Sequence, residues 1–243
     1  MGIFTRKKKS SPDLQGSVKA LLFDTFGTTV DWYSGITAHG RRIGTERAIA
    51  ADWEGLAKEW RSRYKPAVKP VREGKRKWTG FDTLHREQLD KIVGKFGAKQ
   101  LTDADRDRLT LGWHQLGAWP DAALGVRRLR EKFIVGPLSN GTTRQLIDLA
   151  KFSGLEWDVV FGADIFRSYK PDKKMYLGAA GVLGLEPSQI LMVAAHNDDL
   201  KGASKAGLRT CFVRRATEDE EIPGKYDLAV SSFEELATIL GAG

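Results

Sequence analysis

The chain has 243 residues, of which 41% are hydrophobic and 29% are charged, as in an ordinary globular protein. No stretch is apolar for long enough to span a bilayer and no apolar signal region opens the chain, so we expect no membrane partner and no secretion. Cys211 is the single cysteine, which excludes an internal disulfide and favours a cytoplasmic protein.

Basic residues give the chain a net charge of +8, and four of them stand together in residues 6–9. We predict a flexible basic tail over residues 1–16. Elsewhere acidic residues lie between the basic ones and no nucleic-acid-binding motif is present. The pattern therefore favours a solvated basic surface over a nucleic-acid partner, although positive charge also attracts small acidic substrates.

The first predicted strand is the apolar run over residues 18–23, which ends at Asp24. A continuous apolar run of this length is typical of a buried strand in a parallel sheet. Asp24 would then lie beyond the carboxyl end of the strand, where such sheets bind ligands. Taken alone, the stretch is equally compatible with an Asp that caps the next helix.

A helical insertion is predicted after this strand. Three segments show helical periodicity, namely residues 43–56, 84–96 and 101–116. No alternating β-branched run occurs between them. We therefore assign residues 32–118 to a small helical cap domain, and residues 17–31 and 119–243 to the core domain.

The remainder of the chain alternates strands with helices. Strands are predicted over residues 133–138, 159–161, 190–195, 210–213 and 228–230. Helices are predicted over residues 122–130, 143–152, 174–183, 200–206 and 233–240. This alternation predicts an α/β fold with a doubly wound parallel sheet.

Polar side chains follow four of the predicted strands. In sequence order they are Asp24 with Thr28, Ser139 with Asn140, Lys170, and Asp198 with Asp199. Because the carboxyl ends of parallel strands share one edge of the sheet, these groups can converge there. A nucleophilic carboxylate, an ammonium and a second carboxylate suit covalent catalysis at an anion site. Each group also has a structural explanation, such as helix capping by Ser139 and Asn140, but the set favours function.

As a set, these motifs resemble those of the haloacid dehalogenase superfamily, and more closely those of its type II L-2-haloacid dehalogenase group. The matching stretches are FDTFGT at 23–28, LSNG at 138–141, YKPD at 169–172 and VAAHNDDL at 193–200. The resemblance extends over about residues 18–240. It implies a Rossmann-like core with a helical cap, no cofactor and no metal, and it leaves a homodimer open.

The resemblance implies a two-step hydrolysis. Asp24 attacks C2 of a 2-haloacid and forms an ester, and water at the Asp24 carbonyl then releases a 2-hydroxy acid. Lys170 and Asp199 hold Asp24 and position or activate this water. Thr28 and Ser139 hold Asp24 or the substrate carboxylate.

The resemblance also implies a pocket for substrate and halide. Tyr176 matches the family's pocket tyrosine, and Arg61 and Asn140 match the residues that hold the departing halide. A guanidinium there stabilises the developing negative charge. Arg61 is also compatible with the surface of a basic helix, since its position relative to Asp24 depends on how the cap aligns.

Phe26 distinguishes halide displacement from phosphoryl transfer. Phosphatases of this superfamily carry a second Asp two positions after the nucleophile, which protonates the leaving oxygen. The phenyl ring of Phe26 cannot donate a proton, whereas a halide leaves without one. Phe26 therefore favours displacement of halide from carbon.

At His196 and Asn197 the chain departs from the common family pattern. Many members read Ser-Ser-Asn-x-x-Asp where residues 194–199 read Ala-Ala-His-Asn-Asp-Asp. The His-Asn version is similar to a subgroup that handles small haloacetates, even fluoroacetate. We place both residues in the substrate pocket, where His196 would narrow the pocket or position water, and we predict a preference for haloacetates over longer haloacids. A structural histidine is the alternative.

The sequence therefore predicts a hydrolytic dehalogenase that converts small (S)-2-haloacids or haloacetates to 2-hydroxy acids, with the small haloacid as its partner. The first alternative is a Mg²⁺-dependent small-molecule phosphatase, with Asp24 and either Asp198 or Asp199 as oxygen ligands. The second alternative is a non-enzymatic basic binding protein that keeps the fold.

Overall fold

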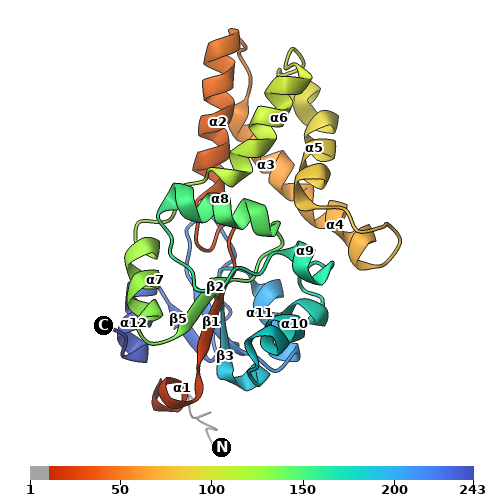
Figure 1. The fold of residues 1–243 in the computed structure, drawn as a ribbon. Helices are drawn as coiled ribbons and strands as arrows, with labels where there is room; N and C mark the ends of the chain where they lie inside the picture. The colour runs from red at the N-terminus through yellow and green to blue at the C-terminus, as the bar shows by residue number, and fades with distance from the viewer. Residues whose placement is uncertain (1–10) are drawn as a thin grey trace, which may run out of the picture.

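Five parallel strands form the centre of the computed structural model, which describes residues 11–243 (Figure 1). Their order across the sheet is β2-β1-β3-β4-β5. The strands are Ala20–Phe23 (β1), Ile134–Pro137 (β2), Ile190–Ala194 (β3), Arg209–Val213 (β4) and Leu228–Val230 (β5). All four pairings between neighbouring strands are parallel, so the predicted α/β class with a parallel sheet is confirmed.

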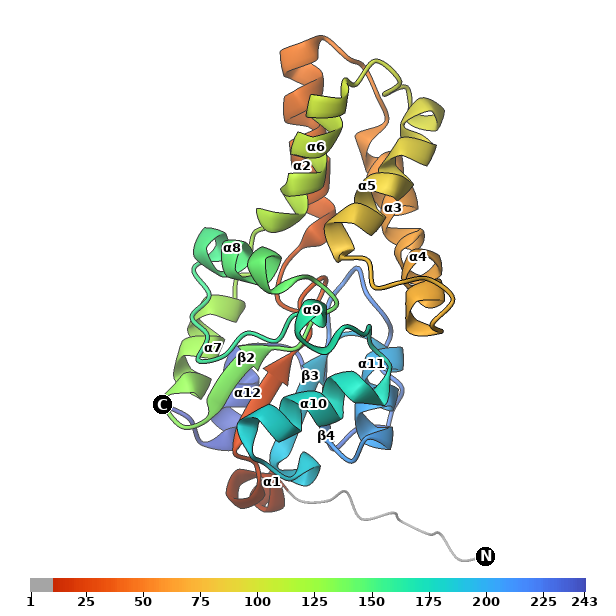
Figure 2. The same ribbon diagram turned by 45° about the vertical axis from the view of Figure 1, so that its right-hand side comes forward.

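The helices between β1 and α7, here called the cap, stand over the carboxyl edge of the sheet (Figures 1 and 2). They are α2 (Trp32–Arg47), α3 (Trp53–Ser62), α4 (Tyr64–Arg72), α5 (Phe81–Ile92) and α6 (Asp103–Leu111), with the 3-10 helices η1 (Val93–Phe96) and η2 (Gly112–His114). The side chains of Asp31, Asp52 and Thr102 accept hydrogen bonds from the first turns of α2, α3 and α6 and so fix where these helices begin. The boundaries predicted for the two domains stay a prediction.

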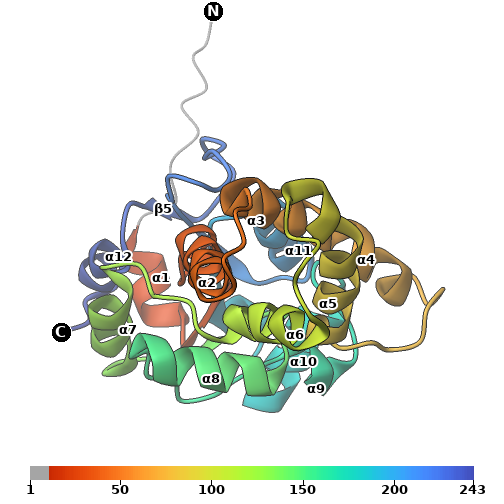
Figure 3. The same cartoon turned by 90° about the horizontal axis from the view of Figure 1, so that it is seen from above.

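Helices cover both faces of the sheet. They are α7 (Ala122–Arg130), α8 (Thr143–Ser153), α9 (Ala163–Phe166), α10 (Lys173–Leu183), α11 (Asn197–Lys205) and α12 (Phe233–Leu240), with the 3-10 helix η3 (Pro187–Gln189). In the view from above, α7 and α12 pack together on one side, and α10 and α11 lie on the other (Figure 3). This double cover explains why the strands are apolar on both faces.

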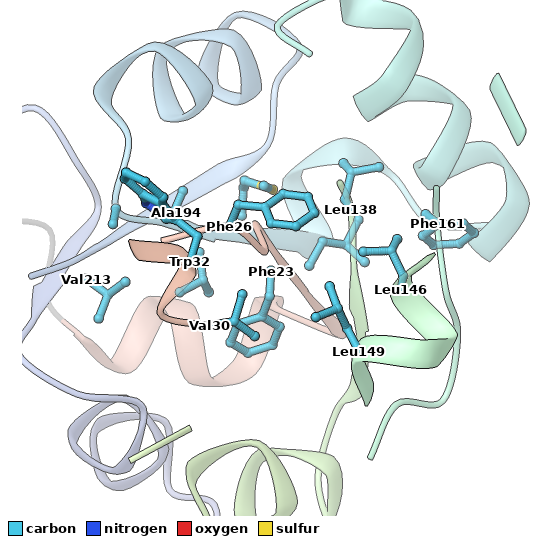
Figure 4. Packing of buried hydrophobic residues seen from close by; sticks show 14 of the residues in the cluster. Phe23, Phe26, Val30, Trp32, Leu138, Leu146, Leu149, Phe161, Ala194 and Val213 are labelled. Carbon is cyan, nitrogen blue, oxygen red and sulfur yellow. The ribbon is translucent and has the colours of Figure 1, made fainter. Parts of the chain in front are cut away.

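β1 lies between β2 and β3 and is buried along its whole length. Each of its four residues is 0% exposed. The ring of Phe23 packs against Phe233 of α12, with 5.0 Å between the ring centroids. Figure 4 shows the apolar side chains around the end of β1, among them Phe26, Val30 and Leu138. Asp24 is therefore attached to one of the most buried segments of the described chain.

The predicted helix over residues 43–56 is wrong as one element. α2 ends at Arg47, Ala48 adopts a left-handed conformation with φ of 52°, and α3 begins only at Trp53. The left-handed residue ends the helical hydrogen-bond ladder, while apolar spacing continues across the break. The periodic segments at 84–96 and 101–116 likewise end in the 3-10 helices η1 and η2.

The strand predicted over residues 159–161 is reduced to an isolated parallel bridge between Leu138 and Phe161. The neighbouring edge of β2 ends in Pro137, which has no N–H to continue a ladder. The helix predicted over residues 200–206 begins earlier, at Asn197, because Asp198 and Asp199 occupy its first turn, where negative charge is favourable.

Part of the predicted flexible tail is helical. α1 spans Ser11–Ser17, Leu14 is buried, and the Gln15 side chain donates a 2.6 Å hydrogen bond to the carbonyl of Ile239. This burial and this hydrogen bond hold Leu14 and Gln15 against the C-terminal helix α12, so the chain is not a flexible tail at these two residues. Residues 1–10, with the basic cluster, lie outside the described residues. Within residues 11–243, no helix has the length and apolar character needed to cross a membrane.

Candidate active site

Asp24 is held at the end of β1 by three side-chain donors. Its backbone N–H donates to the carbonyl of Val193 in β3, which fixes the residue against that strand. Lys170 Nζ lies 2.8 Å from Oδ1, and Thr28 Oγ1 and His196 Nδ1 each lie 2.8 Å from Oδ2. Burial raises the pKa of Asp24, but the charges and hydrogen bonds of Lys170 and His196 outweigh it and hold the pKa far below its usual range. Asp24 is therefore a carboxylate.

Lys170 lies between two buried carboxylates. Its Nζ is 2.8 Å from Asp24 and 2.5 Å from Oδ2 of Asp199. Burial lowers the pKa of Lys170, but the two carboxylates raise it above its usual value, so the amine is protonated. The hydroxyl of Tyr176 donates a 2.7 Å hydrogen bond to Oδ1 of Asp199. Tyr176 thus holds Asp199 from behind and is placed outside the pocket lining.

His196 connects Asp24 to a residue that the sequence did not suggest. Its Nε2 lies 2.8 Å from Oε2 of Glu218, which comes from the loop after β4. Burial lowers the pKa of His196, but the hydrogen bonds to Asp24 and Glu218 outweigh it and raise the pKa to about 9. No motif marks Glu218, and its acidic neighbours at residues 219–221 hide it in a charged loop.

Arg61 reaches the site from the last turn of α3. Its guanidinium lies 5.6 Å from the ring centroid of Trp32 and 5.3 Å from that of Tyr64. Its Nη2 donates to the carbonyl of Phe26 at 3.4 Å and lies 3.5 Å from His196 Nε2. Arg61 therefore faces the core across the cavity and is not on the outer surface of the cap.

Asn140 and Ser139, adjacent in sequence, have different surroundings. The Asn140 side chain accepts a 2.6 Å hydrogen bond from the backbone N–H of Lys170 and donates to the hydroxyl of Tyr64, so it lies on the pocket wall. Ser139 is fully buried, and its Oγ accepts from the N–H of Gly141. The side chain that caps α8 is Thr142.

Asn197 faces away from the cavity. Its side chain donates a 3.0 Å hydrogen bond to the carbonyl of Glu220 and accepts one from the hydroxyl of Tyr226. Its backbone N–H donates to Asp219. The structure therefore does not bring Asn197 to the substrate pocket, because the loop after β4 holds it on the other side of the helix start.

A cavity of about 80 Å³ lies between the core and the cap. Its lining combines charged, polar and aromatic side chains from both parts: Asp24, Phe26, Arg61, Tyr64, Lys65, Asn140, Lys170, Pro171, His196, Asp198 and Asp199. The Phe26 ring stacks on Phe81, with 5.2 Å between the ring centroids, and meets Trp113 edge-on, with 5.7 Å between the centroids. The wall of the cavity at Phe26 is therefore aromatic. Thr28 lies behind Asp24 and Tyr176 behind Asp199.

The oxygens of the acidic residues do not form a metal site. Asp199 is bonded to Lys170 and Tyr176, and Asp198 pairs with Lys65 of the cap at 3.1 Å. Across residues 11–243, no group of three or more His, Cys, Asp or Glu side chains could hold a metal ion. The arrangement instead offers an ionised carboxylate to a small cavity that also contains a guanidinium.

The sequence pattern of haloacid dehalogenase-like hydrolases matches residues 18–207. The chain belongs to this family. It is 30% identical over 232 residues to (S)-2-haloacid dehalogenase 4A of Burkholderia cepacia. The alignment covers 92% of this chain and 95% of that protein. The family membership agrees with a carboxylate at the end of the first strand and helices inserted after it.

Solved structures of related dehalogenases superpose on the whole fold. The structure of a defluorinating L-2-haloacid dehalogenase is 38% identical, with a TM-score of 0.88 over 93% of this chain and 96% of that one. A second L-2-haloacid dehalogenase structure is 37% identical, with a TM-score of 0.86 over 92% of this chain and 99% of the other. The similarity therefore includes both the core and the cap.

Proposed function

We propose that this haloacid dehalogenase-like hydrolase removes halide from small (S)-2-haloacids or haloacetates and releases 2-hydroxy acids. The observation that carries the proposal is the ionised Asp24 carboxylate, which faces a small cavity beside the Phe26 ring and the Arg61 guanidinium. The relatives named above are dehalogenases of 2-haloacids and match nearly the whole chain.

In the first step, an Asp24 oxygen displaces halide from C2 and forms an ester. Lys170, Thr28 and His196 hold the carboxylate in one orientation, which favours an in-line approach. The Arg61 guanidinium stabilises the negative charge that develops on the halide. Phe26 and its aromatic neighbours keep this wall of the cavity apolar, which suits a carbon–halogen bond.

In the second step, water attacks the carbonyl carbon of the Asp24 ester. The carbon–oxygen bond between Asp24 and the substrate breaks, so the hydroxy acid leaves and the carboxylate is restored. Lys170 stays protonated beside Oδ1 and stabilises the negative charge that develops there. Asp199 and Tyr176 keep Lys170 in this position.

The phosphatase alternative is weaker. An alkoxide leaving group needs a proton donor, and Phe26 stands where the superfamily phosphatases carry an acid. Asp199 is engaged by Lys170 and Tyr176, and within residues 11–243 no group of three or more His, Cys, Asp or Glu side chains is placed to hold the Mg²⁺ that the alternative requires.

Haloacetates are the substrate class that we propose within this function. One water molecule needs about 10–15 Å³ of cavity volume. The cavity of about 80 Å³ therefore accepts a molecule of only a few heavy atoms. The His196 side chain fills part of the wall next to Asp24. The similarity to a defluorinating enzyme supports fluoroacetate as a member of this class.

The test is halide release by the EDTA-treated protein with chloroacetate, fluoroacetate and both enantiomers of 2-chloropropionate, alongside 2-chlorobutyrate. A phosphate ester with Mg²⁺ is measured in parallel. We expect metal-independent halide release, fastest with the haloacetates and with the (S) enantiomer. Phosphate release without halide release would overturn the function, and equal turnover of 2-chlorobutyrate and chloroacetate would overturn the substrate preference.

Two further expectations from the sequence stay predictions, a cytoplasmic location and the lack of a nucleic-acid partner, and the resemblance leaves a homodimer open. Salt-dependent binding of nucleic acid without turnover would instead favour the basic binding protein. Light scattering measures whether the chain is a monomer or a homodimer, and a titration with duplex DNA at two salt concentrations checks for a nucleic-acid partner.

A further inference from the structure

Asp24, His196 and Glu218 form a continuous chain of hydrogen bonds. The two nitrogens of the imidazole each lie 2.8 Å from a carboxylate oxygen, Nδ1 from Asp24 and Nε2 from Glu218. A nucleophile in contact with a histidine that a third, acidic group orients is a recurring arrangement in covalent catalysis.

In the resting enzyme His196 cannot accept a proton. Both ring nitrogens face carboxylate oxygens, which are acceptors only, so both nitrogens carry hydrogen and the ring is an imidazolium. Arg61 is the third charged group in contact, with Nη2 at 3.5 Å from Nε2. The two carboxylates hold the positive ring in place against this guanidinium.

Formation of the ester changes the charges around His196, because Asp24 loses its negative charge. We propose that His196 then releases its Nδ1 proton to solvent and acts as the general base that activates water for hydrolysis of the Asp24 ester, with Glu218 as its positioning residue. The inference rests on the proposed dehalogenase function. The His196 side chain is 15% exposed and lines the cavity, which gives the proton a path to solvent.

The step balances in atoms and charge. A water molecule hydrogen-bonded to neutral Nδ1 attacks Cγ of the Asp24 ester and gives one proton to Nδ1. The bond between Cγ and the substrate oxygen then breaks, and the departing alkoxide takes up the other proton of that water to become the 2-hydroxy acid. The products are the Asp24 carboxylate, the His196 imidazolium and the free hydroxy acid, which restores the resting state.

The other groups around Asp24 are less suited to this role. Lys170 is protonated between two carboxylates. Asp199 already accepts from Lys170 at Oδ2 and from Tyr176 at Oδ1. Thr28 donates to Asp24 and accepts from the N–H of Ala195. His196 is the neighbour whose nitrogen lone pair becomes available once Asp24 is esterified.

Glu218 is held where it can orient the ring. Its Oε1 accepts a 2.7 Å hydrogen bond from Trp32 Nε1, while Oε2 contacts His196. Gly27 leaves the space that the carboxylate occupies, since a Cβ at Gly27 would lie 2.4 Å from Cδ of Glu218. The positive φ of 88° at Gly27 also suits glycine. Trp32, Gly27 and His196 therefore fix the Glu218 carboxylate on three sides.

The test uses the variant Glu218→Gln and measures ester formation and ester hydrolysis separately. Rapid-quench mixing with chloroacetate measures the first equivalent of chloride, and intact-protein mass spectrometry follows the Asp24 ester. We expect the chloride burst to persist within a few-fold, and ester hydrolysis to fall by about 10²-fold. The pH midpoint of ester hydrolysis moves to lower pH, because loss of the Glu218 charge lowers the pKa of His196. Glu220→Gln, an exposed residue of the same loop, is the matched control and keeps wild-type behaviour.

A second variant, His196→Ala, accumulates the ester, and added imidazole restores its hydrolysis. Glu218→Gln with the wild-type hydrolysis rate and pH midpoint would overturn the proposal, and so would an ester in His196→Ala that hydrolyses at the wild-type rate without imidazole. Absence of any halide release from the wild-type enzyme would instead overturn the proposed function itself.

Discussion

The ammonium of Lys170 lies 2.8 Å from Oδ1 of Asp24, although 146 positions separate the two residues in the chain. Asp24 follows strand β1, which lies between β2 and β3, and Lys170 precedes α10 at the same edge of the sheet. The Asn140 side chain, after β2, accepts from the backbone N–H of Lys170 at 2.6 Å and fixes the position of this loop. The segments that follow β1 and β2 and the loop before α10 therefore meet beside one carboxylate.

Replacement of Lys170 should destabilise the protein as well as inactivate it. Lys170→Met removes the ammonium from both buried carboxylates, so Asp199 loses its cation and Oδ1 of Asp24 loses its partner. Loss of one partner of a buried ion pair costs about 3–5 kcal/mol, and we expect a decrease of this size in the free energy of unfolding. Urea unfolding measures it. Lys174→Met, at an exposed position of α10, should change the value by no more than about 0.5 kcal/mol.

Asp24→Asn should abolish steady halide release, because an amide is a poor nucleophile and forms no hydrolysable ester. Chloride release from chloroacetate measures the loss, and mass spectrometry after the assay checks that the new amide has not deamidated to Asp. A single turnover of the wild-type enzyme in water labelled with heavy oxygen gives the complementary result. The label should enter Asp24 and not the hydroxy acid; a labelled product would contradict the ester mechanism.

Phe26 joins the core to the cap, so its removal should weaken the fold as well as the pocket. Phe26→Ala removes the stack on Phe81 and the contact with Trp113, and we expect a loss of about 3–5 kcal/mol in the free energy of unfolding. Phe152→Ala is the matched control, since Phe152 is 56% exposed. Equal stability of the two variants in urea would show that Phe26 does not hold the cap against the core.

His114 links the two parts of the molecule through a hydrogen-bonded bridge. Its Nε2 lies 3.1 Å from Asp82 of α5 in the cap, and its Nδ1 lies 2.9 Å from Asp148 of α8 in the core. Burial lowers the pKa of His114, but the hydrogen bonds to both carboxylates outweigh it and raise the pKa above its ordinary value. The bridge is therefore strongest when the imidazole is protonated.

This raised pKa predicts a pH dependence of stability. A histidine whose folded pKa exceeds its unfolded value of about 6.5 stabilises the fold fully below that pH, and the contribution disappears as the pH rises through the folded pKa. The difference in unfolding free energy between wild type and His114→Gln should therefore be largest near pH 6 and decrease toward pH 9. Urea unfolding of both proteins across this range tests it; a constant difference would contradict the bridge.

The sequence by itself determined the parts of this protein that depend on local pattern. The apolar run before Asp24 predicts a strand buried on both faces, and the alternation of strands and helices predicts a parallel sheet. Parallel strands share one carboxyl edge, so the sequence predicts that Asp24, Lys170 and Asp199 meet there. The position of Phe26 beside the nucleophile also follows from the sequence, because Phe26 stands two positions after Asp24.

The tertiary structure alone decided what depends on contacts between distant segments. The left-handed turn at Ala48 and the docking of Leu14 have no periodic signal in the chain. Glu218 lies in a loop without motif or regular structure, and only packing against Gly27 and Trp32 brings it to His196. The charge of His196 in turn depends on carboxylates from two separate segments, because a protonation state is set by the groups that surround a side chain in space.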